Sequence, residues 1–212
     1  MSEKKQHRFY FRKLDNDLKE LNQYLINKQL QILDGKLFDI DQETISKYNI
    51  YNGPSTQLGH MYNIFKFDNP SIEVLKKAIR NTVIDACEYY ELDFESLDYM
   101  IHGWFNLDYK TEGTSGVNPI KNEVFMHDHM GGEGAPVFHG YYCVNAEPSI
   151  TYYKINGEHL YENHNENNKL IVSETGHPHG RDDWYEDEPR ITIAYDISPS
   201  SMDGKGEKWI KL

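Results

Sequence analysis

The sequence predicts a mainly β fold with flanking helices, whose strands form a barrel or a double-sheet jelly roll. From about residue 98 onward, apolar and polar residues alternate with a period of two in several short runs. Clusters of Gly, Pro and Asn separate these runs, as expected for many short strands joined by turns. Before residue 98 the pattern is mixed and partly helical. We therefore expect one integrated domain, in which residues 1–97 pack as a layer on a β core of residues 98–212.

Two helices are expected in the first half of the chain. Leucines recur at helical spacing over residues 14–25, and Gly35 ends this pattern. The second helix covers residues 71–90, because an Asn-Pro-Ser sequence supplies Asn69 as a cap and a proline in the first turn. Residues 60–67, between the two helices, alternate like a strand.

Most expected strands lie in the second half. The longest is residues 99–109, which alternate over their whole length. Shorter strands are expected at residues 122–129, 137–146, 149–155, 168–173, 190–197 and 207–211. Turns or loops are expected at residues 49–59, 111–119, 131–136 and 163–168.

Composition limits the classes of partner. The chain has 212 residues, with 22 Lys and Arg against 34 Asp and Glu, so its net charge is −12. This charge argues against a nucleic-acid backbone or an anionic membrane as the main partner. No apolar run approaches the ~20 residues of a membrane helix, and no apolar stretch of a signal peptide follows the basic N-terminus. Two cysteines cannot form a disulfide scaffold, so we expect a reducing, cytoplasmic location.

Histidines are the unusual feature, since seven of the ten lie between residues 127 and 179. His127 and His129 are two residues apart in an expected strand, so both imidazoles point to one face and Asp128 points to the other. Two imidazoles on one face are a ready pair of metal ligands. A third ligand is offered by a second pair, His177 and His179.

The other histidines of this stretch receive different interpretations. His159 and His164 lie in a polar, Asn-rich segment and are expected to be solvated. His139 lies on a strand that we expect beside the site, as a supporting or core residue rather than a ligand. Residues 190–197 form a strand with one apolar face and one polar face. Arg190 and Thr192 project together on its polar face, which is a suitable clamp for a carboxylate.

Taken in order, these motifs resemble the iron(II)- and 2-oxoglutarate-dependent oxygenases. That family has the motif His-x-Asp/Glu, then a distal His, then an Arg about ten residues later, often as Arg-x-Ser or Arg-x-Thr. The segment 127–129 is similar to the first motif, His179 to the distal histidine, and Arg190 with Thr192 to the last pair, 11 residues further on. Residues 102–113 and 139–144 resemble two strands of a phage and marine-microbial branch of the family. The resemblance covers roughly residues 100–198.

The resemblance implies a double-stranded β-helix (cupin-like jelly roll) that binds Fe(II), 2-oxoglutarate and dioxygen and hydroxylates an unknown substrate. The implied metal ligands are His127, His129 and His179, with His177 as the alternative distal ligand. Arg190 and Thr192 would bind the distal carboxylate of 2-oxoglutarate, together with Tyr142. His129 stands where the family has a carboxylate ligand, which leaves the site one charge more positive. A phage-encoded enzyme would act in the cytoplasm of its host.

Other interpretations remain open at this point. A cupin-like three-histidine dioxygenase that uses no 2-oxo acid has the same ligand count, and Arg190 with Thr192 is the feature against it. A non-catalytic jelly-roll binding or structural module is the other alternative. Trp104, Asn106 and His139 are the residues expected to contact substrate, and the acidic loop 182–188 is expected to border the site entrance. The sequence does not identify the substrate or the oligomeric state.

Overall fold

The computed structural model describes residues 6–37, 43, 55–56, 58–110, 117–118, 123–124, 126–129, 137–155, 159–200 and 208–212. Its helices are α1 (Leu18–Leu33), α4 (Pro70–Tyr90) and α5 (Phe94–Leu97), with 3₁₀ turns η1 (Gly59–Met61) and η2 (Ile64–Lys66). Its strands are β1 (Tyr10–Lys13), β2 (Tyr99–Asp108), β3 (Val117–Asn118), β4 (Glu123–Val124), β5 (Phe138–Asn145), β6 (Ile150–Ile155), β7 (His159–His164), β8 (Lys169–Glu174), β9 (His179–Arg181), β10 (Arg190–Pro199) and β11 (Ile210–Lys211).

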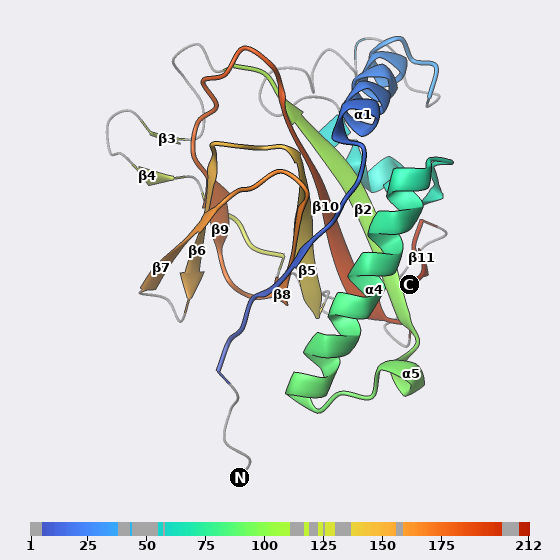
Figure 1. Cartoon of the computed structure of the whole chain (residues 1–212), viewed down its shortest axis with the longest axis vertical. Coiled ribbons are helices and arrows are strands. Elements are labelled where there is room, and N and C mark those ends of the chain that lie inside the picture. Colours follow the sequence, from blue (N-terminus) through green and yellow to red (C-terminus); the bar gives the residue numbers. More distant parts are fainter. Residues whose placement is uncertain are drawn as a thin grey trace.

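Two facing antiparallel sheets form the β core (Figure 1). The larger has the order β1-β8-β5-β10-β2-β11, and the smaller has the order β7-β6-β9. An isolated bridge between His127 and His179 adds the chain around His127 to the edge of the smaller sheet. From β5 onward the chain crosses repeatedly between the sheets, since β5, β8 and β10 belong to the larger and β6, β7 and β9 to the smaller. This winding is that of a double-stranded β-helix, so the predicted jelly roll is confirmed.

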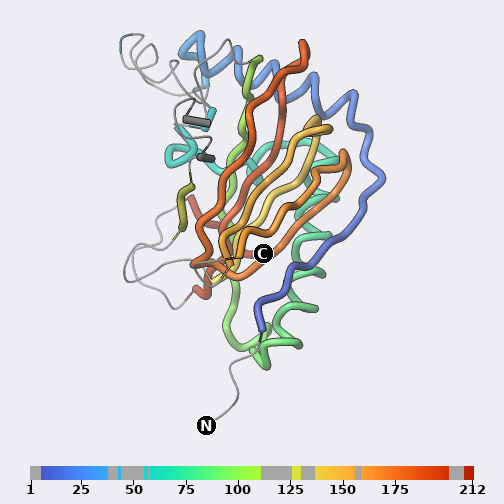
Figure 2. Tube along the Cα trace, turned by 90° about the vertical axis from the view of Figure 1, so that its left-hand side faces the viewer, coloured from blue at the N-terminus to red at the C-terminus, as the bar shows by residue number. Residues whose placement is uncertain are grey.

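Helices cover the outer face of the larger sheet (Figure 2). Helix α1 contacts β5 and β2, and α4 contacts β1 and β8. The apolar face of β10 forms the centre of this layer, because Ile191, Ile193, Tyr195 and Ile197 are fully buried in one cluster with residues of both helices. Burial of these apolar side chains, at about 25 cal/mol per Å², stabilises this layer. Among the described residues, no helix is long and apolar enough to cross a membrane.

Capping side chains fix the first residues of α1 and α4. Asn69 Oδ1 accepts hydrogen bonds from Ser71 N at 2.9 Å and Ile72 N at 3.3 Å, with Pro70 in the first turn, so the predicted start of α4 is confirmed. Helix α1 begins later than the leucine pattern indicated, because the Asp17 side chain caps it by accepting from Glu20 N. Gly35, at a φ of 67°, follows its end as expected.

The expected strand at residues 60–67 is wrong, because two 3₁₀ turns occupy this segment. The cause is the side chain of Asn63, whose Oδ1 accepts from Phe65 N at 3.1 Å and so replaces a strand bond with a tight turn. The Nδ2 of Asn63 donates to Ile101 O at 2.9 Å, which fixes the turn against β2. Local side-chain bonding therefore overrides the alternating pattern.

Four strands, β1, β3, β7 and β9, lie outside the expected strand ranges, and β3 lies within the expected loop at 111–119. β1 pairs with β8 at the edge of the larger sheet and has no strong apolar alternation. β7 was expected to be part of a solvated segment, and its His159 and His164 are indeed exposed. The expected exposed loop at 163–168 is wrong in part, because Asn163 and Asn165 are buried between the sheets, where they bond the Tyr141 hydroxyl. A strand that buries polar residues inside the barrel shows no alternation of apolar and polar residues, so the sequence pattern does not reveal it.

Some expectations fall largely outside the described residues. These are the loops at 49–59, 111–119 and 131–136, together with parts of the strand expected at 122–129. The division of the chain at residue 97 stays a prediction, although β1 shows that the N-terminal region supplies an edge strand to the core sheet.

Candidate metal centre

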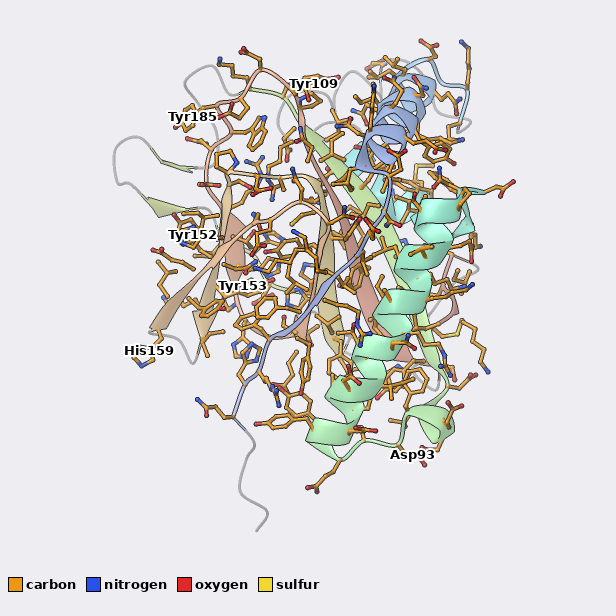
Figure 3. The ribbon with its side chains drawn as sticks, viewed as in Figure 1. Asp93, Tyr109, Tyr152, Tyr153, His159 and Tyr185 are labelled. Carbon is orange, nitrogen blue, oxygen red and sulfur yellow. The ribbon has the colours of Figure 1, made fainter. Side chains whose placement is uncertain are left out.

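The inner face of the larger sheet is polar and carries the candidate site. On β10, Asp196 lies opposite His139 of β5 and His102 of β2, while Thr192 lies opposite Asn106 of β2. Residues directly opposite one another in a sheet share a face. The side chains of alternate β10 residues therefore point between the two sheets, away from the helices. Figure 3 shows Tyr153 of β6 in the middle of this interior.

Three histidines meet at one end of this interior. Paired backbone bonds, His127 N to His179 O at 2.9 Å and His179 N to His127 O at 2.8 Å, place these two residues side by side. Their ring centroids are 4.5 Å apart, and the His129 ring is 5.5 Å from His127 and 5.1 Å from His179. One ligand nitrogen from each ring lies within 4.8 Å of the other two. The group contains His129 rather than Asp128, as strand alternation predicted.

Hydrogen bonds to Nδ1 orient two of the rings. His129 Nδ1 lies 2.6 Å from Asp196 Oδ1, and both side chains are largely buried. His179 Nδ1 lies 3.2 Å from the backbone oxygen of His177. Both acceptors require a proton on Nδ1, which leaves Nε2 of each ring with a free lone pair for a metal.

The surroundings keep two of the three imidazoles neutral. Burial lowers the pKa of His179 to about 3, and the nearby His127 and His129 contribute in the same direction. Burial, followed by His129, also lowers the pKa of His127. Burial alone would lower the pKa of His129, but the hydrogen bond and the negative charge of Asp196 outweigh it and raise the pKa. Neutral imidazole is the form that binds a metal.

Aromatic rings surround the three histidines. Trp104 of β2 stacks on His129 at a centroid distance of 6.0 Å, and Tyr153 stacks on His179 at 5.3 Å. His139 is buried 4.7 Å from the His179 ring, and its Nε2 bonds Ser173 Oγ at 2.8 Å. Burial lowers the pKa of His139 well below its usual value. His139 thus lies beside the three-histidine group without belonging to it.

Arg190 is buried further along the same interior, only 4% exposed. Its Nε donates to Ser149 Oγ at 3.0 Å, and its Nη1 donates to Asp108 Oδ2 at 3.5 Å. Asp108 also pairs with Arg181 Nη2 at 3.1 Å, so one carboxylate contacts two guanidinium groups. No described residue accepts a bond from Arg190 Nη2. This end of the interior is therefore suited to an additional carboxylate.

Residues of both sheets connect the two ends of this interior. Arg190 and Asp196 are six residues apart on β10, roughly 20 Å along the strand. On the facing sheet, however, Arg181 follows His179 by only two residues, about 7 Å, and shares Asp108 with Arg190. Thr192 lies between the two ends, and its Oγ1 accepts from Asn106 Nδ2 at 3.2 Å. Asn106 Oδ1 in turn accepts from Thr56 Oγ1 at 2.9 Å.

Two of the expected residues do not join this site. Tyr142 lies opposite Ile193, on the helix-covered face, and its hydroxyl bonds Asn16 and Asn168. The neighbouring Tyr141 points inward instead, with its hydroxyl donating to Asn165 Oδ1 at 2.8 Å. The sequence could have indicated this, because Tyr141 and His139 are two residues apart on β5 and therefore share a face. His177, the alternative distal ligand, lies in a different cluster with His7 and Glu174.

Sequence reasoning missed several residues that support the site. Asp196 shares the parity of Arg190 and Thr192, so the strand pattern placed it inward but gave it no partner. Asp108, Ser149 and Arg181 had no motif to identify them. The acidic loop 182–188 connects β9 to β10 and therefore lies at the Arg190 end of the barrel. Tyr185 of this loop lies at the edge of the molecule in Figure 3, remote from the central Tyr153.

Comparison with known proteins finds a likeness among solved structures. No protein-family model matches the sequence, and no curated protein matches it. Among solved structures, full-length Neurospora crassa T7H in complex with alpha-KG aligns with 91% of this chain and 74% of its own, at 12% identity and a TM-score of 0.47. The fold assignment rests on the strand order of this chain itself.

Proposed function

We propose that this chain is an iron(II)- and 2-oxoglutarate-dependent dioxygenase that hydroxylates a substrate still to be identified. The observation that carries the proposal is the pairing of two features inside one barrel. Three histidines converge at one end. Toward the other lies a buried arginine whose Nη2 has no acceptor among the residues that the structure describes. The placement in the phage and marine-microbial branch rests on the motifs at residues 102–113 and 139–144.

The donor set suits iron(II). Imidazole is a common ligand of iron, and His127, His129 and His179 can each offer one nitrogen. The lowered pKa values keep His127 and His179 neutral, whereas the raised pKa of His129 means that the metal competes with a proton there. Compared with two histidines and a carboxylate, three neutral ligands leave the centre one charge more positive. Asp196 compensates in part, because its bond to His129 Nδ1 makes this imidazole a stronger donor and fixes its orientation.

The Arg190 end suits the distal carboxylate of 2-oxoglutarate. Arg190 Nη2 can donate to one carboxylate oxygen, and the Thr192 hydroxyl, which accepts from Asn106, can donate its own proton to the ligand. Asp108 pairs with both Arg181 and Arg190, and Asp182 also faces the two guanidinium groups. Burial raises the pKa of Asp182, and the charges of the two guanidinium groups act against this larger effect. An anionic ligand would gain affinity here through the hydrogen bond that Arg190 Nη2 can donate.

When bound, iron(II) together with 2-oxoglutarate would supply the oxidising power for hydroxylation of a C–H bond by dioxygen. The chain itself binds, orients and shields, and no side-chain acid or base is needed. Trp104 and Tyr153 stack on the ligand rings and restrict their movement. His127 is the exposed member of the group, so we expect substrate to approach from its side, past Trp104, with Asn106 and His139 deeper in the interior.

The test is formation of succinate from 2-oxoglutarate by protein that is loaded anaerobically with iron(II) and then exposed to dioxygen. We expect slow succinate formation by the wild type even without its substrate, and none by His179→Ala or Arg190→Ala. Matched controls are His159→Ala and Arg80→Ala, which alter exposed side chains and should retain the wild-type rate. Wild-type rates in both site variants would contradict the proposal.

A cupin-like three-histidine dioxygenase without a 2-oxo acid is the second candidate. The observation in its favour is the absence of a carboxylate among the three grouped ligands. This candidate predicts that the wild type binds iron but forms no succinate, and that Arg190→Ala leaves its oxygenase chemistry intact. Wild-type protein that binds no iron would instead favour a non-catalytic jelly-roll module.

A further inference from the structure

We propose that His7, Glu174 and His177 form a second metal site, which takes Zn²⁺ or a similar divalent transition metal and has a structural role. The site joins the N-terminal segment to the connection between β8 and β9. That connection carries His179, so the second metal would hold a ligand of the first in position. The proposal goes beyond the oxygenase function and does not depend on it.

The three side chains come from distant parts of the sequence. His7 precedes β1, Glu174 ends β8, and His177 lies in the connection that follows. Because β1 pairs with β8, the N-terminal segment runs along the edge of the larger sheet (Figure 1). His7 Nδ1 lies 3.4 Å from Glu174 Oε2, and the His7 and His177 rings are 4.1 Å apart. One ligand atom from each of the three lies within 4.8 Å of the others.

Burial supplies an independent observation. The His7 side chain is only 6% exposed, although it lies close to the chain terminus. Its Nδ1 is accounted for by Glu174, but its buried Nε2 has no hydrogen-bond partner among the residues that the structure describes. An unsatisfied buried polar atom costs about 1–3 kcal/mol. An ion pair between His7 and Glu174 would explain Nδ1 and leave Nε2 unexplained, whereas a metal provides the missing partner.

The donor set indicates the class of metal. Two imidazoles and one carboxylate suit Zn²⁺ and other late first-row divalent ions, whereas Ca²⁺ and Mg²⁺ prefer oxygen ligands alone. The two neutral histidines and the single carboxylate leave a net charge of +1 on a bound divalent ion. A water molecule can complete a tetrahedral set.

The second site is linked directly to the first. The backbone oxygen of His177 accepts from His179 Nδ1 at 3.2 Å, so fixing His177 also fixes the orientation of the His179 ring. Between Glu174 and His177 the chain turns through Gly176, whose φ is 91°. Lys154 N donates to Pro178 O at 2.8 Å, which holds the far end of the same connection to β6. A metal between residues 174 and 177 would fix the near end.

The test is metal content per chain in full-length protein that is stripped with a chelator, loaded with Zn²⁺ and desalted. We expect two ions in the wild type, one in His7→Ala or Glu174→Gln, one in His179→Ala, and none in the double variant Glu174→Gln/His179→Ala. Glu174→Gln keeps the side-chain shape, and circular dichroism will verify that each variant is folded. The matched control is Glu162→Gln/His164→Ala, an exposed pair on β7 at 3.9 Å that should retain two ions.

The outcomes separate the two sites. One ion in the wild type that Glu174→Gln does not remove, but that His179→Ala does, would overturn the second site and leave the oxygenase centre intact. One ion that only Glu174→Gln removes would support the second site and contradict the first. As a further readout, Zn²⁺ should raise the melting temperature of His179→Ala and should not raise that of the double variant. Equal shifts in both would overturn the proposal.

Discussion

The two faces of β10 differ strongly in composition and less in burial, since Ala194 and Asp196 of the inner face are half-buried. On the outer face, Ile191, Ile193, Tyr195 and Ile197 are fully buried beneath the helices. On the inner face, Arg190 and Thr192 are 4% and 2% exposed, and Asp196 lies against His129. One strand therefore supplies alternate residues to the packed core and to the candidate site. Successive residues of β10 therefore alternate between the helix-covered core and the interior between the two sheets, rather than between core and solvent.

Each polar residue of the inner face has a specific partner. Arg190 bonds Asp108 and Ser149, Thr192 bonds Asn106, and Asp196 bonds His129. Burying such groups without partners would cost several kcal/mol. The outer face needs only shape and apolar area. Substitutions on the outer face should therefore lower stability alone, whereas substitutions on the inner face should also lower ligand binding.

The largest expected effect is the loss of iron binding in His179→Ala. Removal of an outer-sphere partner typically lowers metal affinity 10–100-fold, so removal of a ligand should lower it by more than about 100-fold. Anaerobic titration with iron(II) measures the change, with His159→Ala as the control. Unchanged affinity in His179→Ala would show that the inner face does not hold the metal where the histidines converge.

Ile193→Ala should have the largest effect on stability. Truncating a fully buried Ile leaves a cavity and typically lowers the free energy of unfolding by about 2–5 kcal/mol. Iron bound per folded chain should not change, because Ile193 faces the helices. Urea unfolding measures the difference, and Val74→Ala on the exposed face of α4 should change it by less than about 0.5 kcal/mol. A loss below about 1 kcal/mol in Ile193→Ala would argue against the packed outer layer.

Asp196→Asn should weaken iron binding without removing it. The amide cannot supply the negative charge that strengthens His129 as a donor, so affinity should fall about 10–100-fold. The same anaerobic titration measures this effect, and Asp128→Asn is the matched control, since Asp128 is exposed and outside the ligand group. A larger effect of Asp128→Asn than of Asp196→Asn would reverse the assignment of the two carboxylates.

The smallest expected effect is that of Asn69→Ala at the start of α4. Its Oδ1 caps two backbone N–H groups of the helix, and loss of such a cap costs about 1 kcal/mol. Thermal unfolding should show a lower melting temperature, whereas succinate formation should remain at the wild-type rate. Asn69→Asp retains the capping oxygen and should restore most of the stability. Equal losses in both variants would indicate that the cap contributes nothing.

The sequence predicted the features that depend on residues close together in the chain. The Asn69 cap, the α4 periodicity and the two-residue spacing of His127 and His129 depend on neighbouring residues, and all three agree with the structure. The jelly roll followed from the repeated short alternating runs. Strand parity also placed Arg190 and Thr192 on one face, together with Asp196.

What the sequence could not predict depends on long-range contacts. The pairing of Asp108 with two arginines, and of His7 with Glu174, joins residues 73 to 167 positions apart. The strand expected at residues 60–67 was wrong because the side chain of Asn63 competes with strand bonding. β7 was missed because its one buried residue, Asn163, is polar and bonds the Tyr141 hydroxyl inside the barrel, so the strand has no apolar face.

The most direct test of the inner-face centre is anomalous diffraction at the iron edge from crystals soaked anaerobically in iron(II) and 2-oxoglutarate. We predict an iron peak within coordination distance of one nitrogen each from His127, His129 and His179. The density for 2-oxoglutarate should extend from this peak toward Arg190. A strong iron peak only between His7, Glu174 and His177, or no peak inside the barrel, would contradict the account.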